Sequence, residues 1–182
     1  GKDTFIIGEH SYKNYKTCNL TSNDGLKEEY KEGWLCDISY LAIGETKDIE
    51  ESREVDGRVI FDSTYAYIGI PKNYLLYVTQ YLKDNFEENY ACDITTNSLN
   101  EITFICLNKE IYDFDELYFV IDGYGYTIPP EDLFQPYNET HVVSLINFSS
   151  ERDDIFIFGK PFFKHYTLIF DYDQKNVGFV GK

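Results

Sequence analysis

Short apolar runs separated by turn residues dominate this chain and restrict what it can fold into. Each run is rich in Val, Ile, Phe and Tyr, which favour pleated, half-buried strands, and each ends near Gly, Pro, Asn or Asp. The 17 Tyr and 14 Phe among 182 residues add to this preference. We expect strands at residues 4–8, 34–43, 58–60, 101–107, 117–122, 126–128, 141–148, 155–158, 167–170 and 177–180.

The clearest helical spacing lies at residues 71–86, which begin with a proline, a residue tolerated at the start of a helix. Its apolar side chains share one face. They belong to Tyr74, Leu75, Val78, Tyr81 and Leu82. Segment 44–57 is charged and is interpreted as a hairpin or an exposed loop, and segment 87–100 is polar and is interpreted as a loop. The pattern therefore predicts an all-β sandwich or barrel-like domain with minor helices, forming one unit over residues 1–182.

The formal net charge of −16 limits the partners of this chain. A surface this negative repels phosphate backbones and anionic lipid surfaces, so we expect no nucleic-acid binding and no polybasic membrane contact. No apolar run approaches the roughly 20 residues of a membrane span, and no signal peptide is visible. Because the chain opens directly on an expected strand, we interpret it as part of a longer product.

The cysteines Cys18, Cys36, Cys92 and Cys106 are even in number. They form no Cys-x-x-Cys pair, and no histidine lies at zinc-site spacing, so we expect no zinc site. The acidic turn at residues 171–176 lacks the ligand spacing of a calcium loop, and no metal or cofactor is expected. Four cysteines allow three pairings, of which the local one, Cys18 with Cys36 and Cys92 with Cys106, is the simplest.

Three Asn-x-Ser/Thr sequons, at Asn19, Asn138 and Asn147, are candidate glycosylation sites. Together with the even number of cysteines, they favour a protein that is secreted or resides in an endomembrane or acidic compartment. The Gly-Tyr-Gly at residues 123–125 is interpreted as a turn, because no helix follows it as a dinucleotide-binding loop requires.

An ordered series of segments surrounds Asp62. The carboxylate follows the apolar residues 59–61 and precedes Ser63. Downstream, residues 118–130 read as a strand, a turn and Ile-Pro-Pro, and residues 157–159, Ile-Phe-Gly, precede a helical turn and a final hairpin. In this order and spacing, nearly the whole chain resembles the C-terminal lobe of a pepsin-like aspartic protease.

The resemblance implies the fold of that lobe, a six-stranded psi-loop sandwich or barrel, with a disulfide between Cys92 and Cys106. It also implies that Asp62 is the second catalytic carboxylate and that Ser63 supplies the hydroxyl that links the loops of the two lobes. In this family two carboxylates share a proton; the charged one activates a water, and the protonated one polarises the scissile carbonyl. The other carboxylate is expected in an N-terminal lobe that is absent from this chain, because no second Asp-Thr/Ser-Gly pattern occurs here.

The residues after Asp62 depart from the family pattern of Asp, Thr/Ser, Gly, Thr/Ser. Thr64 replaces the Gly, where the backbone approaches the carboxylates closely. Tyr65 replaces a small hydroxyl residue that hydrogen-bonds the carboxylate. An alternative alignment deletes two residues after Ser63, and it also lacks the Gly. Lys160 follows Ile-Phe-Gly where the family often has Asp. We therefore expect an inactive or impaired site.

Two functions remain open at this point. The first is a non-catalytic, secreted pepsin-like domain that binds a protein or peptide through the old cleft or through its aromatic surface. The second is the C-terminal half of a working aspartic endopeptidase, completed by the N-terminal lobe. A homodimer that pairs two copies of Asp62 is a weaker third. If these residues have no functional role, we interpret Asp62 as a loop aspartate that caps backbone N–H groups and Ser63 as a turn hydroxyl.

Overall fold

The computed structural model describes residues 12–22, 25–44, 53–85, 92–108, 114–149, 151–152 and 154–181. The strand expected at residues 4–8 lies outside them. Within them, no helix is both long enough and apolar enough to span a membrane.

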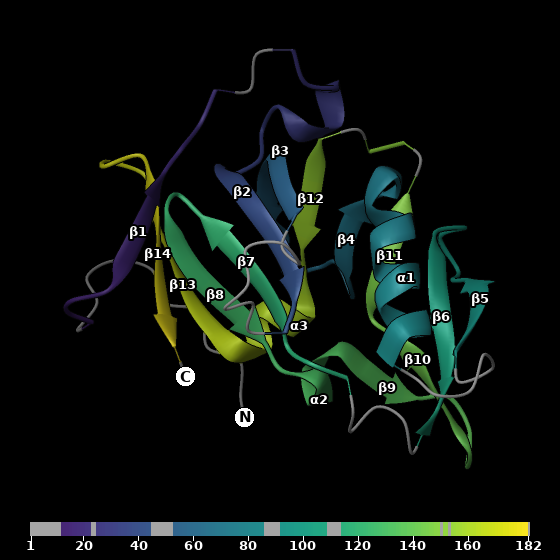
Figure 1. Ribbon diagram of the computed structural model, residues 1–182. Helices are drawn as coiled ribbons and strands as arrows, with labels where there is room; N and C mark the ends of the chain where they lie inside the picture. Colours follow the sequence, from purple (N-terminus) through teal and green to yellow (C-terminus); the bar gives the residue numbers. More distant parts are fainter. Residues whose placement is uncertain are drawn as a thin grey trace.

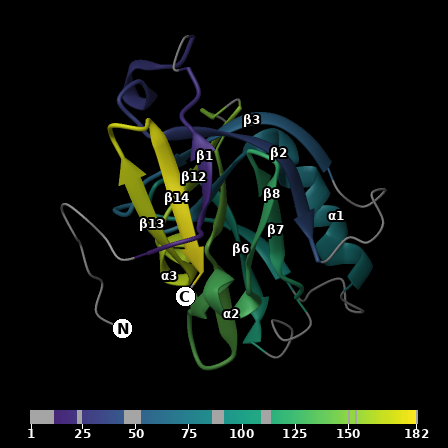
Figure 2. The same cartoon turned by 90° about the vertical axis from the view of Figure 1, so that its left-hand side faces the viewer.

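The strands form two sheets (Figures 1 and 2). The smaller sheet has the order β1-β14-β13, and its bounds are β1 (Lys16–Asn19), β13 (Tyr166–Asp171) and β14 (Asn176–Gly181). The larger sheet has eleven strands in the order β8-β7-β2-β3-β12-β4-β11-β6-β10-β9, with β5 paired to β6. Its bounds are β2 (Leu35–Ile43), β3 (Arg53–Phe61), β4 (Ile68–Pro71), β5 (Cys92–Thr96), β6 (Ile102–Leu107), β7 (Leu117–Ile121), β8 (Tyr124–Ile128), β9 (Phe134–Pro136), β10 (His141–Ser144), β11 (Ile146–Ser149) and β12 (Ile155–Phe158).

Short helices connect and cover these strands. They are η1 (Glu28–Tyr30), η2 (Lys72–Tyr74), α1 (Leu75–Asn85), α2 (Pro130–Leu133) and α3 (Lys160–His165). The helix expected at residues 71–86 is confirmed as η2 and α1, and Val78 and Leu82 are the buried side chains of α1, as the helical spacing predicts. The all-β class with minor helices is therefore confirmed, and in the part of the chain that the structure describes the strands form sheets of three and eleven.

The arrangement of three strands fixes the place of Asp62. Strand β12 lies between β3 and β4; it runs parallel to β3, pairing Phe158 with Phe61, and antiparallel to β4, pairing Phe158 with Ile68. Residues 62–67 connect β3 to β4 and must therefore pass around the end of β12. This segment is called the Asp62 loop below.

A cluster of phenylalanine rings packs behind the Asp62 loop. Phe158 is fully buried, with its ring centroid 4.5 Å from that of Phe119 and 5.0 Å from that of Phe162. Phe61, the last residue of β3, packs against the rings of Phe158, Phe162 and Phe179. Such tightly packed aromatic groups make a rigid support for the residue that follows Phe61.

The charged segment 44–57 was interpreted as a hairpin or an exposed loop, and the hairpin is confirmed, because β2 and β3 pair antiparallel. Segment 87–100 was interpreted incorrectly as a loop. Strand β3 begins at Arg53 rather than at residue 58, because Val55 and Gly57 are buried and alternate with charged residues. Strand β5 lies within residues 87–100; it is mostly exposed and is held by pairing with β6. The strand expected at residues 141–148 is also divided at Leu145 into β10 and β11.

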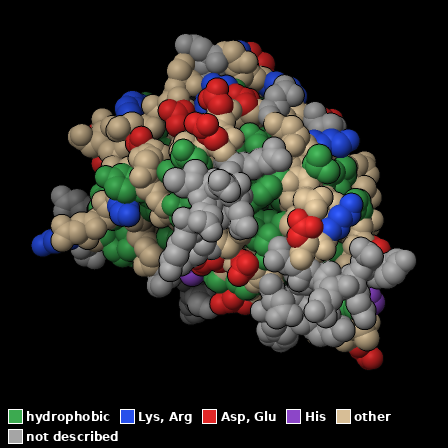
Figure 3. All heavy atoms as spheres, viewed as in Figure 1, with side chains coloured by type: hydrophobic (Ala, Val, Ile, Leu, Met, Phe, Trp, Pro, Cys, Tyr) green, Lys and Arg blue, Asp and Glu red, His purple; other side chains and the backbone are tan. Residues whose placement is uncertain are grey.

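The local disulfide pairing is confirmed. Cys18 bonds to Cys36, and Cys92 bonds to Cys106, directly opposite it on β6. The turn expected at residues 123–125 lies one residue earlier, at Asp122 and Gly123, both at positive φ; Tyr124 and Gly125 already belong to β8. Acidic side chains gather near the upper edge of the face shown in Figure 3, in line with the net charge of −16.

Candidate functional site

Asp62 lies directly after β3, half-buried at the start of the Asp62 loop. Its backbone N–H donates to the carbonyl of Phe158 at 3.1 Å, which ties it to β12. Its carboxylate oxygen Oδ1 accepts the backbone N–H of Thr64 at 2.8 Å and the Thr64 hydroxyl at 2.7 Å. Because a carboxylate oxygen has two lone pairs, Thr64 alone fills the hydrogen-bonding capacity of Oδ1.

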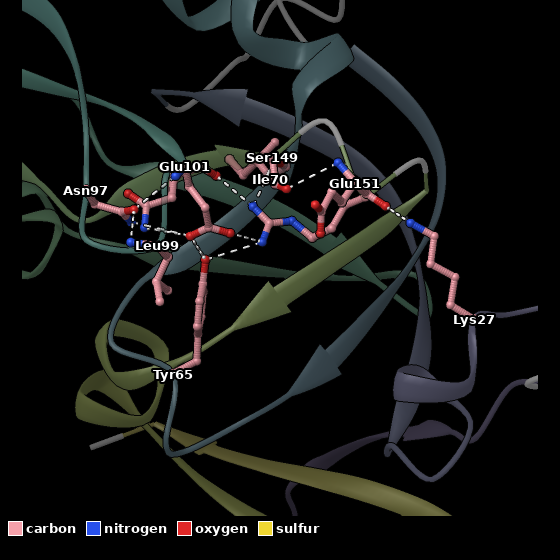
Figure 4. A network of polar contacts seen from close by, with 10 residues as sticks. Lys27, Tyr65, Ile70, Asn97, Leu99, Glu101, Ser149 and Glu151 are labelled. Atoms are coloured by element: carbon pink, nitrogen blue, oxygen red, sulfur yellow. Dashed lines mark hydrogen bonds and ion pairs between the residues drawn. The ribbon is translucent and has the colours of Figure 1, made fainter.

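The next residues of the Asp62 loop point in different directions. Ser63 and Thr64 are exposed. The Tyr65 ring points toward Glu101, and its hydroxyl donates to Glu101 Oε2 at 2.7 Å (Figure 4). The phenol therefore does not replace the small hydroxyl side chain that the family pattern has at this position; the hydroxyl bond to the carboxylate comes from Thr64 instead.

The Ile-Phe-Gly segment lies against the Asp62 loop, as the sequence predicted. The backbone N–H of Gly159 donates to the carbonyl of Tyr67 at 3.0 Å, and that of Lys160 donates to the carbonyl of Tyr65 at 2.8 Å. A Cβ atom added at Gly159 would lie 2.2 Å from the carbonyl oxygen of Tyr65. Only a glycine permits this approach of two backbones, while the Lys160 side chain is exposed.

Replacing Gly159 with alanine is expected to lower the free energy of unfolding by about 1–3 kcal/mol, because the added methyl group meets backbone atoms that must move. The measurement is urea unfolding of the variant and the wild type. Gly181→Ala is the matched control, since nothing lies within 4 Å of its added Cβ, and it should change stability by less than about 0.5 kcal/mol. Equal midpoints for the two variants would contradict the tight contact.

A buried ion pair lies beneath the Asp62 loop. Glu101 and Arg152 are 8% and 5% exposed, and Arg152 Nη1 bonds to Glu101 Oε1 (Figure 4). Asn97 and Asn147 each donate to Glu101 Oε2, at 3.4 and 3.3 Å. The sequence analysis missed these residues. No local pattern marks them, since Glu101 and Arg152 are 51 positions apart and are brought together only by the sheet.

Four of the described tyrosines have pKa values above the ordinary value of a phenol. Burial is the largest cause; it raises the pKa of Tyr30 from 10.0 to about 12, and it raises the pKa values of Tyr65, Tyr81 and Tyr126 as well. Because each folded pKa lies above the unfolded value, the contribution of these phenols to stability is complete below pH 10.0 and is lost as pH rises through the folded pKa values.

We therefore expect alkaline pH to destabilise the protein. The free energy of unfolding in urea should fall once pH passes 10.0, alongside delayed phenolate formation in an ultraviolet absorbance titration. A Tyr126→Phe variant should lose less stability over that range, since one of the shifted phenols is gone. A free energy of unfolding that stays level above pH 10.0 would contradict this expectation.

An open hollow lies beside the Asp62 loop. Its lining residues come from the loop, from β5, β6, β9 and β10, and from the segments that follow β5 and β9, and none of them is charged. Tyr67 belongs to the loop and Asn97 to the buried cluster, so the hollow adjoins both. At its other side, Tyr137 is 61% exposed. The hollow thus offers aromatic rings and neutral hydrogen-bonding groups, as ligand sites commonly do.

The three sequons differ in accessibility. Asn19 and Asn138 are exposed. Asn147 is 0% exposed on β11, and its side-chain amide donates to Glu101. The expectation of a glycan at Asn147 is therefore corrected, because the folded lobe leaves no space for one there.

The sequence pattern of the family described as "Asp: Eukaryotic aspartyl protease" matches residues 7–181. The chain belongs to the eukaryotic aspartyl protease family. Among solved structures, the fold is similar to that titled "Crystal structure of aspartic proteinase from Irpex lacteus", with a TM-score of 0.70 and 13% sequence identity. The match covers 93% of this chain and 47% of that one, so this chain spans about half the length of that proteinase. No curated protein matches the sequence.

Proposed function

We propose that this chain is the C-terminal lobe of a two-lobe pepsin-like protein whose catalytic half-site is impaired, and that the lobe binds protein or peptide segments without cutting them. The other lobe is its first partner, which the coverage of about half of a solved aspartic proteinase (47%) supports. In this proposal Asp62 and Ser63 keep the positions of the second catalytic motif, but one carboxylate oxygen of Asp62, Oδ1, is not free to serve as the family mechanism requires.

The observation that carries the proposal is the pair of hydrogen bonds from Thr64 to Asp62 Oδ1, at 2.8 and 2.7 Å. The family mechanism needs the two carboxylates to share a proton and to bind the attacking water. With both lone pairs of Oδ1 already used, only Oδ2 is left to take the water or the shared proton, and the half-site is impaired. The Thr64 side chain is also exposed, at a position where the family has no side chain.

The hollow beside Tyr67 supports a binding role. Its uncharged lining suits a neutral segment of chain, and the surrounding net charge of −16 disfavours an acidic one. Ile94 and Leu99, which flank its lining residues 95–98 in sequence, are 60% and 56% exposed. Exposed apolar groups beside such a hollow are typical of surfaces that bind another chain.

A secretory or endomembrane location fits the same proposal. Two disulfides persist in oxidising compartments rather than in the cytosol. Asn19 and Asn138 are exposed sequons, which a lumenal enzyme can glycosylate.

The test uses the natural full-length product, a mixed peptide library at acidic pH and an Asp62→Ala variant. Mass spectrometry reads both the peptides cleaved and those retained by the protein. The proposal predicts retained peptides and no cleavage above the level of Asp62→Ala. Cleavage that disappears with Asp62→Ala and with a statine-type inhibitor would overturn it, and an empty retained fraction would overturn the binding role.

A working endopeptidase is the second candidate, and one observation favours it. The loop geometry around Asp62 is kept: its N–H bonds to β12 at 3.1 Å, the Thr64 N–H reaches the carboxylate, and Gly159 packs against the loop. If the Thr64 hydroxyl rotates away when the other lobe is present, Oδ1 regains a free lone pair. The same peptide assay separates the two candidates.

A further inference from the structure

We infer that Tyr65 is a positioning residue, through which the buried Glu101–Arg152 ion pair holds the Asp62 loop in place. Tyr65 is three residues after Asp62 and two before Tyr67, the wall of the hollow. Its hydroxyl donates to Glu101 Oε2 at 2.7 Å and accepts from Arg152 Nη1 at 3.4 Å (Figure 4). The phenol thus joins both charges of the pair at once.

The cost of burying these charges suggests a role beyond stability. Removing two charges from water is expensive, and well-packed apolar residues often serve a core equally well or better. Here Glu101 and Arg152 are 8% and 5% exposed, and the side chains of Tyr65, Asn97 and Asn147 also donate hydrogen bonds to Glu101. What such a polar network supplies is one defined geometry, because each hydrogen bond is directional.

The Arg152 side chain contacts both Tyr65 in the Asp62 loop and strand β4, which follows the loop. Arg152 Nη2 donates to the carbonyl of Ile70 in β4 at 3.5 Å, while its Nη1 contacts the Tyr65 hydroxyl. Between them, Gly69 leaves room: a Cβ there would lie 3.1 Å from both Arg152 Cζ and Tyr65 Oη. The position of Tyr65 is therefore fixed relative to β4.

The backbone of the Asp62 loop, including that of Tyr65, is held by hydrogen bonds from Gly159 and Lys160. The carbonyl of Tyr65 accepts the N–H of Lys160 at 2.8 Å, and the carbonyl of Tyr67 accepts that of Gly159 at 3.0 Å. Tyr65 is thus fastened to α3 through its backbone and to the buried ion pair through its side chain. Because both the backbone and the side chain of Tyr65 are hydrogen-bonded, Tyr65 restricts the positions of Asp62 and Tyr67 in the same loop.

The state of the phenol suits this role. Burial raises its pKa above the ordinary value, so the hydroxyl keeps its proton at neutral pH and remains a donor to Glu101. Oε2 of Glu101 accepts from Tyr65, Asn97 and Asn147, and Oε1 binds Arg152. The bond from Tyr65 is the shortest of the three at Oε2.

The test is amide hydrogen exchange on the natural full-length product carrying Tyr65→Phe. We expect the amides of Thr64, Gly159 and Lys160 to exchange about tenfold faster than in the wild type, since one hydrogen bond to a buried charge is lost. Amides of the β13–β14 hairpin should keep their wild-type rates. Tyr67→Phe is the matched control: it removes the same hydroxyl group from the same loop and should leave these rates unchanged.

Two results would overturn the inference: unchanged exchange at Thr64 in Tyr65→Phe, or a uniform increase that includes the β13–β14 hairpin, which marks a general loss of stability. A second measurement needs no variant. In the wild type at rising urea concentrations, the amides of Thr64 and Glu101 should open together, because one network holds both. Opening at clearly different urea dependence would also overturn the inference. The proposed function enters neither measurement, so it can fail independently.

Discussion

Replacing Arg152 with methionine is expected to lower the free energy of unfolding by about 3–5 kcal/mol, the usual cost of removing one partner from a buried ion pair. The substitution leaves Glu101, 8% exposed, as an uncompensated buried charge. It also removes the donor to the carbonyls of Ile70 and Asn147, at 3.5 and 3.4 Å. Urea unfolding followed by circular dichroism measures the effect.

Two further variants test whether the loss of stability comes from the burial of the ion pair. Lys31→Met breaks the surface pair with Glu28, whose side chains are 44% and 87% exposed, and should cost less than about 1 kcal/mol. The double substitution Arg152→Met with Glu101→Leu should recover much of the loss, because no charge is left unpaired. A cost for Arg152→Met as small as that of Lys31→Met would contradict the account of this cluster.

The fold was largely predictable because hydrophobic periodicity records which faces are buried. The helical spacing of residues 71–86 predicted the helix. The apolar runs at residues 117–122 and 155–158 predicted β7 and β12, because their apolar side chains enter the core. Strand β5 was missed because it has no buried face of its own; its burial pattern is mostly exposed, and pairing with β6 holds it. Pairing of that kind leaves little trace in composition.

The sequence predicted which segments form the candidate site, but not how their side chains are oriented. Asp62, Ser63 and the neighbouring Gly159 were expected, and β12 does lie against the Asp62 loop. The orientation of Thr64 and Tyr65 was not predictable, because it depends on partners distant in sequence. The Tyr65 hydroxyl bonds to Glu101 and Arg152, which offer it a buried acceptor and donor, and only the sheet brings these two together.

Replacing Thr64 with glycine is expected to produce the largest change in activity. The variant keeps the backbone N–H that bonds to Asp62 at 2.8 Å and removes the hydroxyl that bonds at 2.7 Å. One lone pair of Oδ1 is then free for the attacking water or the shared proton, as the family mechanism requires. Hydrolysis should rise by about a hundredfold or more over the wild type, the lower end of what a positioned general acid or base contributes.

The most direct measurement is therefore peptide hydrolysis at acidic pH by the natural full-length product, compared among the wild type, Thr64→Gly and Thr64→Ser. The serine variant keeps a hydroxyl at the same position and is the matched control. The account predicts cleavage by Thr64→Gly that disappears when Asp62→Ala is added, with the wild type and Thr64→Ser silent. A wild type that cleaves as fast as Thr64→Gly would contradict the claim that Thr64 impairs the site.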